Sequence, residues 1–581
     1  MSTKSSVPTW RILTVAAAIS VGFLVLIFQL VRWQVVQRGE FLPEPGTPAN
    51  SSGKNLSARG PERGAIVDIH GAPLAFDSFH WEIWVEPWLV PEDRETALAA
   101  QLIQSLGPSL QVSPEDLQKQ LLAHEKRIVM LTRNAPQPVG QAIHEWDDAP
   151  GVVARPFPGR YYPQGSLASH MLGFVNTVPQ SFYGVEEYYD NYLFDVKTPW
   201  FPSDPRVQSV YRQLPADWQE ILPSAVGQDL VLTIDRRVQA VTERTLADAI
   251  GMYKAESGTI VVMDPKTGAI LAMASLPAYD PNQYANTQTE LLSNPAITRP
   301  YEPGSVFKIV TMAAGIDAGL ITPSTVLTDS LSIEVGGRTI YNSIFRTYGQ
   351  VTVRQALVRS LNIPTAEVAL MLDESRFYQY VRRFGFGNLT EIDLANESPG
   401  TVKVPGNPLW SQVDLATNAF GQGLSVTPVQ MVRAAAVIAN GGTLVKPHVV
   451  DSMVFRGRII KPDTVPARRV IQPETAQQVK DMMVSVVKEA TISASVDGYT
   501  VAGKTGTAQV AIGGSYSPTE TIHSFVGFVP ADNPKFVALV KLDAPKTHPW
   551  ADSTAAPTFS RLARELLRIW RVPPEQVATK P

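Results

Sequence analysis

A long apolar run near the N-terminus is followed by basic and aromatic residues. The stretch Ile12–Val31 carries no charged side chain, and about 20 apolar residues in a helix can span a bilayer. Arg32, Trp33 and Arg38 come next, as is typical of a membrane interface. A cleavable signal peptide is the alternative, although its apolar core would be shorter and would end in small residues. We expect a short tail at residues 1–11 and a transmembrane anchor at residues 12–31.

The next region changes from polar linker to mixed structure. Residues 32–58 are rich in Pro, Gly, Ser and Asn, which indicates a flexible linker. Alternating apolar positions then predict strands between residues 63 and 85, and helical periodicity predicts helices at Pro91–Leu106 and Pro114–His124. Residues 199–223 show no clear period and are interpreted as a long loop. The pattern predicts a first α+β domain over residues 59–226.

A second domain is predicted from Gly227 onward. We expect a strand at residues 229–234, a helix at 236–252, and two strands at 258–263 and 269–274. A helical block at residues 355–438 follows, and then three strands at 499–510, 524–529 and 536–542 and a final helix at 556–570. The turn Asp264–Gly268 has residues typical of a hairpin. Antiparallel strands separated by a helical block predict an α+β fold, with a five-stranded sheet and a helical subdomain over residues 227–575.

Composition narrows the chemistry. The 581-residue chain has a formal net charge of -4 and no cysteine, so disulfides, zinc–cysteine sites and thiol catalysis are excluded. We find no basic stripe of the kind that binds nucleic acid. The sequence contains no cluster with metal-ligand spacing, and we expect neither a metal nor a cofactor.

Ser305 and Lys308 are the first candidate for catalysis. Pro303-Gly304 interrupts the chain, and apolar residues at helical spacing follow from Val306, so Ser305 is expected in the first turn of a buried helix. A lysine three residues later lies on the same face. If burial and positive neighbours keep that lysine neutral, it can take the serine proton. The same Ser-x-x-Lys pattern occurs at Ser51/Lys54 and Ser485/Lys488, so the motif alone decides nothing.

Two further motifs select the first copy. Ser360-Leu-Asn362 lies in the helical block, and Lys504-Thr-Gly506-Thr507 lies on a predicted sheet strand. A second Lys-Thr-Gly at Lys266 falls in the predicted hairpin and is interpreted as structural. The three motifs in this order, each on the matching kind of element, resemble the signature of the penicilloyl serine transferases.

Flanking sequences make the resemblance more specific. Glu302-Pro-Gly-Ser305, Phe384-Gly-Phe-Gly387, Phe420-Gly-Gln-Gly423 and Ala502-Gly-Lys-Thr-Gly-Thr-Ala508 are similar to class B penicillin-binding proteins. The resemblance covers nearly all of the chain after Arg59, and residues 59–226 look like the family's non-catalytic, dimerisation-type pedestal. One departure is Ile69-His70, where the family usually has Arg-Asn before Gly71, and this puts the pedestal contacts in doubt.

The resemblance implies a peptidoglycan D,D-transpeptidase that transfers an acyl group in two steps. Ser305 would attack the D-Ala-D-Ala carbonyl of a stem peptide with Lys308 as base, and Ser360 would carry the proton to the leaving amine. Asn362 would orient Lys308 or the substrate amide, and Lys504 would lower the pKa of Lys308.

The same resemblance assigns substrate contacts. Thr505, Gly506 and Thr507 would bind the substrate, with the two threonine hydroxyls on its carboxylate, and the N–H groups of Ser305 and Thr507 would form the oxyanion hole. β-Lactam antibiotics should acylate Ser305. We interpret Glu302 and Glu397 as structural, and His523 as a surface or packing residue.

Two other functions remain open at this stage. The first is a D,D-carboxypeptidase or β-lactamase-like hydrolase on the same fold, in which water accepts the acyl group. The second is a non-catalytic β-lactam sensor or division scaffold. The resemblance further implies a single-pass protein of the bacterial cell membrane with its catalytic domain outside, paired with a SEDS-family membrane glycosyltransferase. Tyr301-Glu-Pro-Gly-Ser305 favours a division role over an elongation role.

Overall fold

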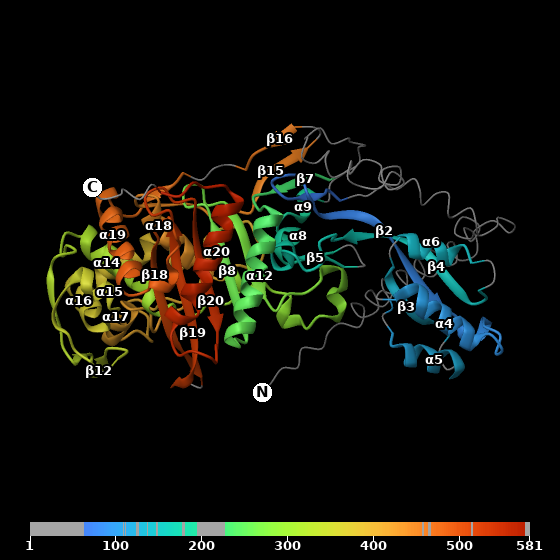
Figure 1. Ribbon diagram of the computed structural model, residues 1–581, viewed down its shortest axis with the longest axis horizontal. Helices are drawn as coiled ribbons and strands as arrows, with labels where there is room; N and C mark the ends of the chain where they lie inside the picture. The colour runs from blue at the N-terminus through green and yellow to red at the C-terminus, as the bar shows by residue number, and fades with distance from the viewer. Residues whose placement is uncertain are drawn as a thin grey trace, which may run out of the picture. The chain divides into compact units, whose positions relative to one another are not determined.

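The computed structural model describes residues 63–575, except residues 108–109, 111, 124–126, 136, 147–148, 177–179, 194–226, 345, 456–457, 463–465 and 513–514 (Figure 1). The predicted tail, anchor and linker at residues 1–58 and the predicted loop at residues 199–223 therefore lie outside the described residues. Within the described ranges, no helix combines the length and the apolar character that crossing a bilayer would need.

A five-stranded antiparallel sheet organises the C-terminal part of the chain. Its strands are β8 (Ser257–Met263), β9 (Ile270–Leu276), β18 (Ala502–Ile512), β19 (Ser515–Val529) and β20 (Phe536–Asp543). They lie in the order β18-β19-β20-β8-β9, so the two early strands meet the three late ones where β8 pairs with β20. This arrangement confirms the predicted mixed α+β fold and leaves β18 as an edge strand.

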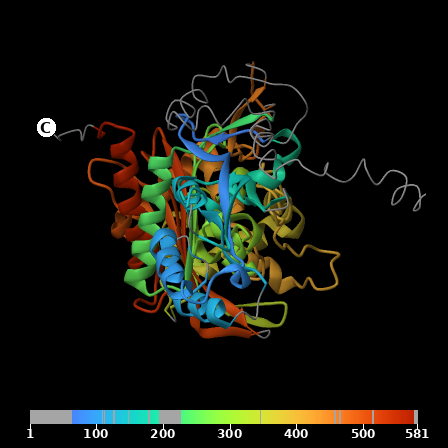
Figure 2. The ribbon, with the colours of Figure 1, turned by 90° about the vertical axis from the view of Figure 1, so that its right-hand side faces the viewer.

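Helices cover both faces of this sheet (Figure 2). On β8, Ile260 and Val262 pack in one core with α12 (Arg236–Tyr253) and α20 (Ala555–Ile569). Val261 and Met263 point to the opposite face and pack in a second core with α14 (Lys308–Asp317) and α18 (Pro428–Ala439). Alternation along the strand places successive side chains in different cores, which explains why these strands are apolar throughout.

The helical block lies beyond the β18 edge of the sheet. It contains α14, α15 (Val353–Val358), α16 (Asn362–Arg383) and α17 (Gln412–Asn418), and α19 (Pro473–Glu489) packs against α14, α15 and β18. Two hairpins pair β10 (Val326–Asp329) with β13 (Gly349–Thr352), and β11 (Ser332–Val335) with β12 (Arg338–Tyr341). Short elements complete this part: α13 (Pro295–Thr298), β14 (Thr443–Leu444) and β17 (Arg468–Arg469), with 3-10 turns at residues 281–286, 289–291, 492–494 and 551–553.

A second sheet contains strands from both predicted domains. Its order is β16-β15-β7-β1-β2-β3, with β4 also paired to β2. The strands are β1 (Ile66–Val67), β2 (Pro73–Val85), β3 (Val129–Ala135), β4 (Val152–Tyr161), β7 (Asp229–Leu232), β15 (Val450–Phe455) and β16 (Arg458–Ile460). The strand predicted at residues 229–234 exists, but it pairs with β1 and β15 and not with the five-stranded sheet. Apolar alternation predicts a strand without indicating which sheet it joins.

The N-terminal part of the second sheet carries its own helices. These are α4 (Glu95–Leu106), α5 (Pro114–Ala123) and α6 (Gln137–His144), which share a separate apolar core with β2 and β3. The 3-10 turn at residues 87–89 joins β2 to α4. Three short helices and a small hairpin lead back toward β7: α7 (Ser169–Leu172), the hairpin of β5 (Phe174–Val175) and β6 (Ser181–Phe182), α8 (Gly184–Tyr188) and α9 (Asp190–Leu193).

The turn at Ile69-His70, where the sequence departs from the family pattern, lies at a junction of hydrogen-bonded acidic residues. Asp68 accepts hydrogen bonds from the backbone N–H of Ala72 (2.8 Å) and of Arg236 (3.0 Å), which connects the β1–β2 turn to the start of α12. His70 Nε2 lies 3.1 Å from Asp235 Oδ2, and Asp235 also caps α12. Asp68 and Asp235 therefore hold this junction together.

A buried ion network holds the N-terminal part together. The Glu186 carboxylate, which is fully buried, accepts from Arg63 Nε (2.7 Å), Arg160 Nε (2.7 Å) and the Tyr162 hydroxyl (3.2 Å). Burial alone would raise the pKa of this carboxyl group, but the charges of Arg160 and Arg63 outweigh that effect and hold the pKa below its ordinary value of 4.5. Asp77 binds the far side of Arg160 at 2.9 Å.

We expect Glu186→Gln to lower the free energy of unfolding by about 3 kcal/mol, because removing one partner leaves buried guanidinium charges uncompensated. The ionised Glu186 stabilises the fold above its unfolded pKa, and this contribution is lost as the pH falls through the lower folded pKa. The difference between wild type and variant should therefore shrink in acid. Denaturant unfolding at pH 7 and pH 4 measures both effects. Glu115→Gln, on the exposed face of α5, should change stability by less than about 0.5 kcal/mol. Equal losses in the two variants would contradict this account of the network.

Candidate active site

Ser305 lies in a tight turn that precedes a buried helix. The turn Gly304–Phe307 is a 3-10 helix, and the α-helix α14 begins only at Lys308, which differs from the predicted α-helical turn. Ser305 is half-buried, whereas both of its neighbours in the turn are buried. Side chains three residues apart eclipse each other in a 3-10 helix, so the tighter turn keeps Lys308 behind Ser305.

Glycines allow three segments to meet at this turn. Gly304 has a φ of 55° and donates a hydrogen bond to Gly421 O at 3.0 Å. A Cβ on Gly421 would lie 2.2 Å from Gly304 O, and a Cβ on Gly506 would lie 2.8 Å from Pro303 O. The serine turn is therefore held between the Phe420–Gly423 loop and β18 at distances that exclude any side chain at Gly421 or Gly506.

Lys308 is fully buried and its amine has defined partners. Lys308 Nζ donates to Ser360 O (2.5 Å) and to Asn362 Oδ1 (2.8 Å), and it lies 3.3 Å from Ser360 Oγ. A neutral amine has two hydrogens and one lone pair. If Ser360 O and Asn362 Oδ1 take the two hydrogens, the lone pair remains free to accept a proton from a hydroxyl group.

Ser360 lies between the two lysines. Its hydroxyl accepts a hydrogen bond from Lys504 Nζ at 3.0 Å and also lies 3.3 Å from Lys308 Nζ. Its backbone φ of 58° is in the left-handed region, which costs of order 1–3 kcal/mol for a residue with a Cβ. The surrounding contacts hold this conformation, and it presents both the carbonyl and the hydroxyl of Ser360 to Lys308.

Asn362 is positioned by a chain of amide contacts. Its Nδ2 donates to Tyr341 O (3.0 Å), and its backbone N–H donates to Asn342 Oδ1 (2.8 Å). Asn342 Nδ2 in turn donates to Asp329 Oδ1 at 2.7 Å. The side chain of Asn362 thus points its oxygen at Lys308, which is the first of the two roles predicted for it.

The pKa values of the two lysines are both lowered, but the causes differ. Burial lowers the pKa of Lys308 well below the ordinary lysine value of 10.5, and the charge of Lys504 lowers it further. Burial lowers the pKa of Lys504 to about 7. Two neighbouring ammonium groups in a desolvated site repel each other. The geometry therefore favours a shared state in which Lys504 keeps the proton and Lys308 is the neutral base.

The strand that carries Lys504 also presents hydroxyl groups. Thr507 Oγ1 accepts a hydrogen bond from the backbone N–H of Ala551 at 3.1 Å, so the hydrogen of its hydroxyl is available to donate to a ligand. Lys504 Nζ also lies 3.0 Å from Thr505 O and 3.4 Å from Thr505 Oγ1. The contact of Thr507 with Ala551 fixes the loop between β20 and α20 against β18.

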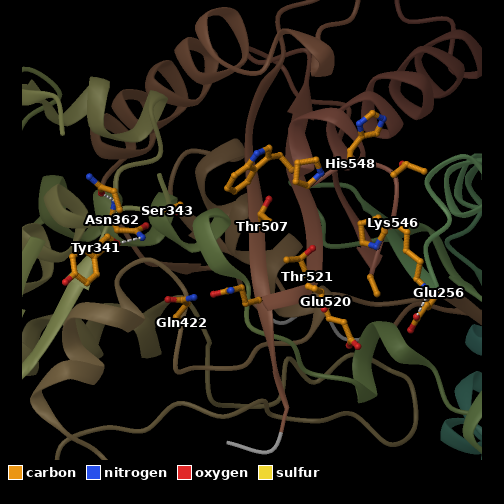
Figure 3. A pocket seen from close by; sticks show the side chains of 18 residues that line it. Glu256, Tyr341, Ser343, Asn362, Gln422, Thr507, Glu520, Thr521, Lys546 and His548 are labelled. Carbon is orange, nitrogen blue, oxygen red and sulfur yellow. Dashed lines mark hydrogen bonds and ion pairs between the residues drawn. The ribbon is translucent and has the colours of Figure 1, made fainter. Parts of the chain in front are cut away.

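A cavity of about 1090 Å³ opens beside this strand. Thr507 lies at its centre (Figure 3), with Tyr341, Ser343, Asn362 and Gln422 on one side. Thr521, Glu520, Lys546, His548 and Glu256 line the other side. Of the candidate site residues, Asn362 and Thr507 line this cavity, so a groove large enough for a peptide lies next to the cluster of the serine and the two buried amines.

Other candidate residues lie outside the catalytic cluster. Glu302 accepts from Gly423 N (3.1 Å) and the Tyr516 hydroxyl (3.0 Å), and Glu397 accepts from Thr390 N (2.7 Å). His523 is buried and lies 2.8 Å from Thr554 Oγ1, so it is a packing residue. Lys266, from the second Lys-Thr-Gly copy, lies in the β8–β9 turn and contacts Asn533. Ser485, from another Ser-x-x-Lys copy, lies on α19. Among the described residues, no group of three or more His, Cys, Asp or Glu side chains is arranged to hold a metal ion.

Sequence reasoning missed residues that the fold alone brings to the site. Tyr341 and Asn342 position Asn362 but precede it by about 20 residues, in a polar stretch without a recognisable motif. Lys546 and Ala551 belong to the loop after β20. For this segment the sequence predicted only a connection between a strand and a helix. Their contribution depends on strand pairing between distant segments, and no local pattern reports that pairing.

Comparisons with known proteins agree with this geometry. Residues 258–564 match the penicillin-binding protein transpeptidase domain, and residues 58–193 match the penicillin-binding protein dimerisation domain. The stage V sporulation protein D of Bacillus subtilis is 34% identical over 517 residues, which cover 87% of this chain and 78% of that protein. The peptidoglycan D,D-transpeptidase FtsI of Escherichia coli is 29% identical over 576 residues, covering 98% of this chain and 94% of the relative.

A solved structure shows the same architecture. Penicillin-binding protein 3 of Mycobacterium tuberculosis, in complex with ampicillin, superposes with a TM-score of 0.67 at 27% identity. The superposition covers 90% of this chain and 98% of that one. Together with the matched domains and the full-length relatives, it shows that this chain belongs to the class B penicillin-binding proteins.

Proposed function

We propose that this chain is a serine-type D,D-transpeptidase that cross-links peptidoglycan stem peptides at D-Ala-D-Ala and is acylated by β-lactams. One observation carries the proposal. The Lys308 amine behind Ser305 is fully buried, its two hydrogens have acceptors on Ser360 and Asn362, and Lys504 shares the Ser360 hydroxyl. A serine needs a neutral base nearby to become a nucleophile, and this arrangement supplies one.

Acylation uses the groups in sequence. Ser305 Oγ attacks the carbonyl carbon between the two D-Ala residues, and its proton passes to the lone pair of Lys308 Nζ. The N–H groups of Ser305 and Thr507 stabilise the oxyanion, a contribution of a few kcal/mol for each donor. The proton then moves through Ser360 Oγ to the nitrogen of the terminal D-Ala, the C–N bond breaks, and the acyl group stays on Ser305.

Transfer to the acceptor reverses the proton path. An amine from a neighbouring stem attacks the ester carbonyl, and its proton returns through Ser360 and Lys308 to Ser305 Oγ as the C–O bond breaks. Lys504, Thr505 and Thr507 hold the terminal carboxylate of the donor, and Gly506 allows β18 to approach the serine turn. Every step uses a side chain or backbone group of this chain.

The arrangement along the chain completes the proposal. Residues 1–11 form a cytoplasmic tail, residues 12–31 a single membrane anchor, and residues 32–58 a linker. Residues 59–226 form a pedestal, and residues 227–575 form the transpeptidase domain on the outer side of the bacterial cell membrane. From the resemblance to class B penicillin-binding proteins, we propose a SEDS-family membrane glycosyltransferase as its partner. The similarity to FtsI across 98% of the chain supports a role in division.

Acylation by penicillin tests the nucleophile. Incubation with benzylpenicillin should increase the intact mass of the wild type by one whole penicillin molecule, because opening the β-lactam ring releases no atoms. Ser305→Ala should show no increase in mass. Ser485→Ala, which alters the second Ser-x-x-Lys copy on α19, should be acylated like the wild type. An adduct on Ser305→Ala, or none on the wild type, would overturn the assignment.

The pH profile of acylation tests the role of Lys504. Below the pKa of Lys308 the amine is protonated and cannot accept a proton, which produces an acidic limb. Because the charge of Lys504 lowers that pKa, Lys504→Met should raise the pKa and move the acidic limb to higher pH. Lys504→Arg keeps the charge and should leave the limb closer to its wild-type position. The position of the acidic limb is measured from acylation rates with a fluorescent penicillin between pH 5 and pH 9. An acidic limb at the same pH in Lys504→Met and the wild type would contradict the role of Lys504 in lowering the pKa of Lys308.

A further inference from the structure

Two exposed arginines share one tyrosine ring beside the second catalytic motif. Arg359 directly precedes Ser360, and its guanidinium carbon lies 4.4 Å from the centre of the Tyr348 ring. Arg346 places its guanidinium carbon 4.9 Å from the centre of the same ring. The charge distribution of an aromatic ring attracts a guanidinium group to its face. Tyr348 therefore keeps two positive groups close together at the surface, and these three residues are here called the arginine site.

No acidic side chain neutralises the arginine site. Neither guanidinium group forms an ion pair or a hydrogen bond with any residue that the structure describes. Asp329 belongs to the same region, but it is buried, and its two oxygens accept from Asn342 Nδ2 (2.7 Å) and the backbone N–H of Tyr348 (2.8 Å). Like charges without a counter-charge repel each other. The planar donor fork of arginine matches the two oxygens of a carboxylate, so the arginine site has the chemistry to bind one.

The loop that carries Tyr348 connects the arginine site to the active-site cavity. One carboxylate, that of Asp329, binds both ends of the loop 342–348. The amide nitrogen of Asn342 and the backbone nitrogen of Tyr348 therefore lie no more than about 8 Å apart at ordinary bond lengths. Asn342 lines the cavity, and its Oδ1 accepts from the backbone N–H of Asn362 at 2.8 Å. The arginine site thus adjoins the side of the cavity on which Figure 3 shows Asn362.

An acceptor stem would reach the serine from this side. This step rests on the proposed transpeptidase function, in which β18 holds the terminal carboxylate of the donor stem. The attacking amine of the second stem gives its proton to Ser360, which lies in the connection from α15 to α16. The amine therefore approaches over the helical block, and Arg359 is the residue next to Ser360 in that connection.

The acceptor stem has a carboxylate of its own within reach of the arginine site. Stems of one polymer share their composition, so the acceptor also ends in D-Ala-D-Ala. Two extended residues span about 7 Å, and an amino side chain of four or five carbons adds about 6 Å at ordinary bond lengths. An arginine guanidinium reaches about 7 Å from its own Cα, and the Cα atoms of Arg359 and Ser360 are about 3.8 Å apart. A stem whose amine contacts Ser360 is therefore long enough to place its terminal carboxylate at the arginine site.

We propose that Arg346 and Arg359 bind the terminal carboxylate of the acceptor stem, with Tyr348 as their common support. Each guanidinium group supplies charge-assisted hydrogen bonds to that carboxylate. The contact acts on the second step of the reaction, because it positions the attacking amine beside Ser360. It also selects acceptor stems that keep a charged terminus over stems whose terminus is neutral.

Partition of the acyl-enzyme tests the proposal on the full chain. The donor is isotope-labelled diacetyl-L-lysyl-D-alanyl-D-lactate, which loses lactate as its diacetyl-lysyl-D-alanyl group forms an ester with Ser305. Water or an acceptor amine then takes this group from the serine. The acceptors are acetyl-L-lysyl-D-alanyl-D-alanine and its C-terminal amide, and the same pair with 2,6-diaminopimelate in place of lysine. Because the amines of the donor are blocked, every labelled transfer product comes from an acceptor.

Mass spectrometry gives the ratio of transfer product to hydrolysis product for the labelled group. The ratio with the free carboxylate divided by the ratio with the amide is the carboxylate preference. It should be about fivefold in the wild type, a size typical of exposed ion pairs. It should shrink at about 1 M salt, where screening is strong.

Variants assign the carboxylate preference to the arginine site. Arg346→Met and Arg359→Met together should bring it close to one, and Arg359→Lys, which keeps the charge, should retain part of it. Arg382→Met removes an exposed arginine in the last turn of α16 and should keep the wild-type preference. Each preference is measured within one variant, so a general loss of activity cancels.

The outcomes separate this inference from the proposed function. Hydrolysis of the labelled group without transfer to any of the acceptors would refute the transpeptidase function itself, as would failure of benzylpenicillin to acylate the wild type. Equal transfer to the carboxylate and amide forms would refute only the acceptor inference. A preference that survives in the double methionine variant, or that is lost equally in Arg382→Met, would refute its assignment to Arg346 and Arg359.

Discussion

Two lysine amines removed from water beside one serine hydroxyl form the constraint on which the rest of this structure depends. Lys308 and Lys504 are both buried, and both contact Ser360. Desolvation and mutual repulsion make two ammonium groups costly at this position. The site is therefore stable with one of the two lysines protonated and the other neutral. The burial and closeness of the two amines thus provide the neutral base that serine acyl transfer needs.

Three separate elements supply the members of this cluster. The sheet edge brings Lys504, the start of α14 brings Lys308, and the connection from α15 to α16 brings Ser360 in a left-handed conformation. Gly421 and Gly506 allow the serine turn to come into backbone contact with its neighbours. Because each close approach tolerates no Cβ, the glycines near the three motifs serve the same geometry as the catalytic side chains.

The sequence predicted the positions of helices and strands well, but it predicted less well which strands pair with each other. Helix α12 and the late strands β19 and β20 follow from periodicity. The strand after Gly227 was predicted at the start of the second domain without a partner, and it pairs with β1 of the first predicted domain. Ser305, Lys308, Ser360 and Lys504 were found by motif order. Asn342 and Lys546 were not, because their places depend on long-range pairing and carry no local signature.

The protonation state of Lys308 is the central claim, and its direct measure is the NMR titration of the chain labelled with 13Cε-lysine. Lys308→Met and Lys504→Met assign the two resonances. The account predicts that Lys308 titrates below Lys504 and that at neutral pH its Cε resonance is that of a neutral amine. A Lys308 resonance that keeps the shift of a protonated ammonium group up to pH 9, while Lys504 loses its proton first, would contradict it.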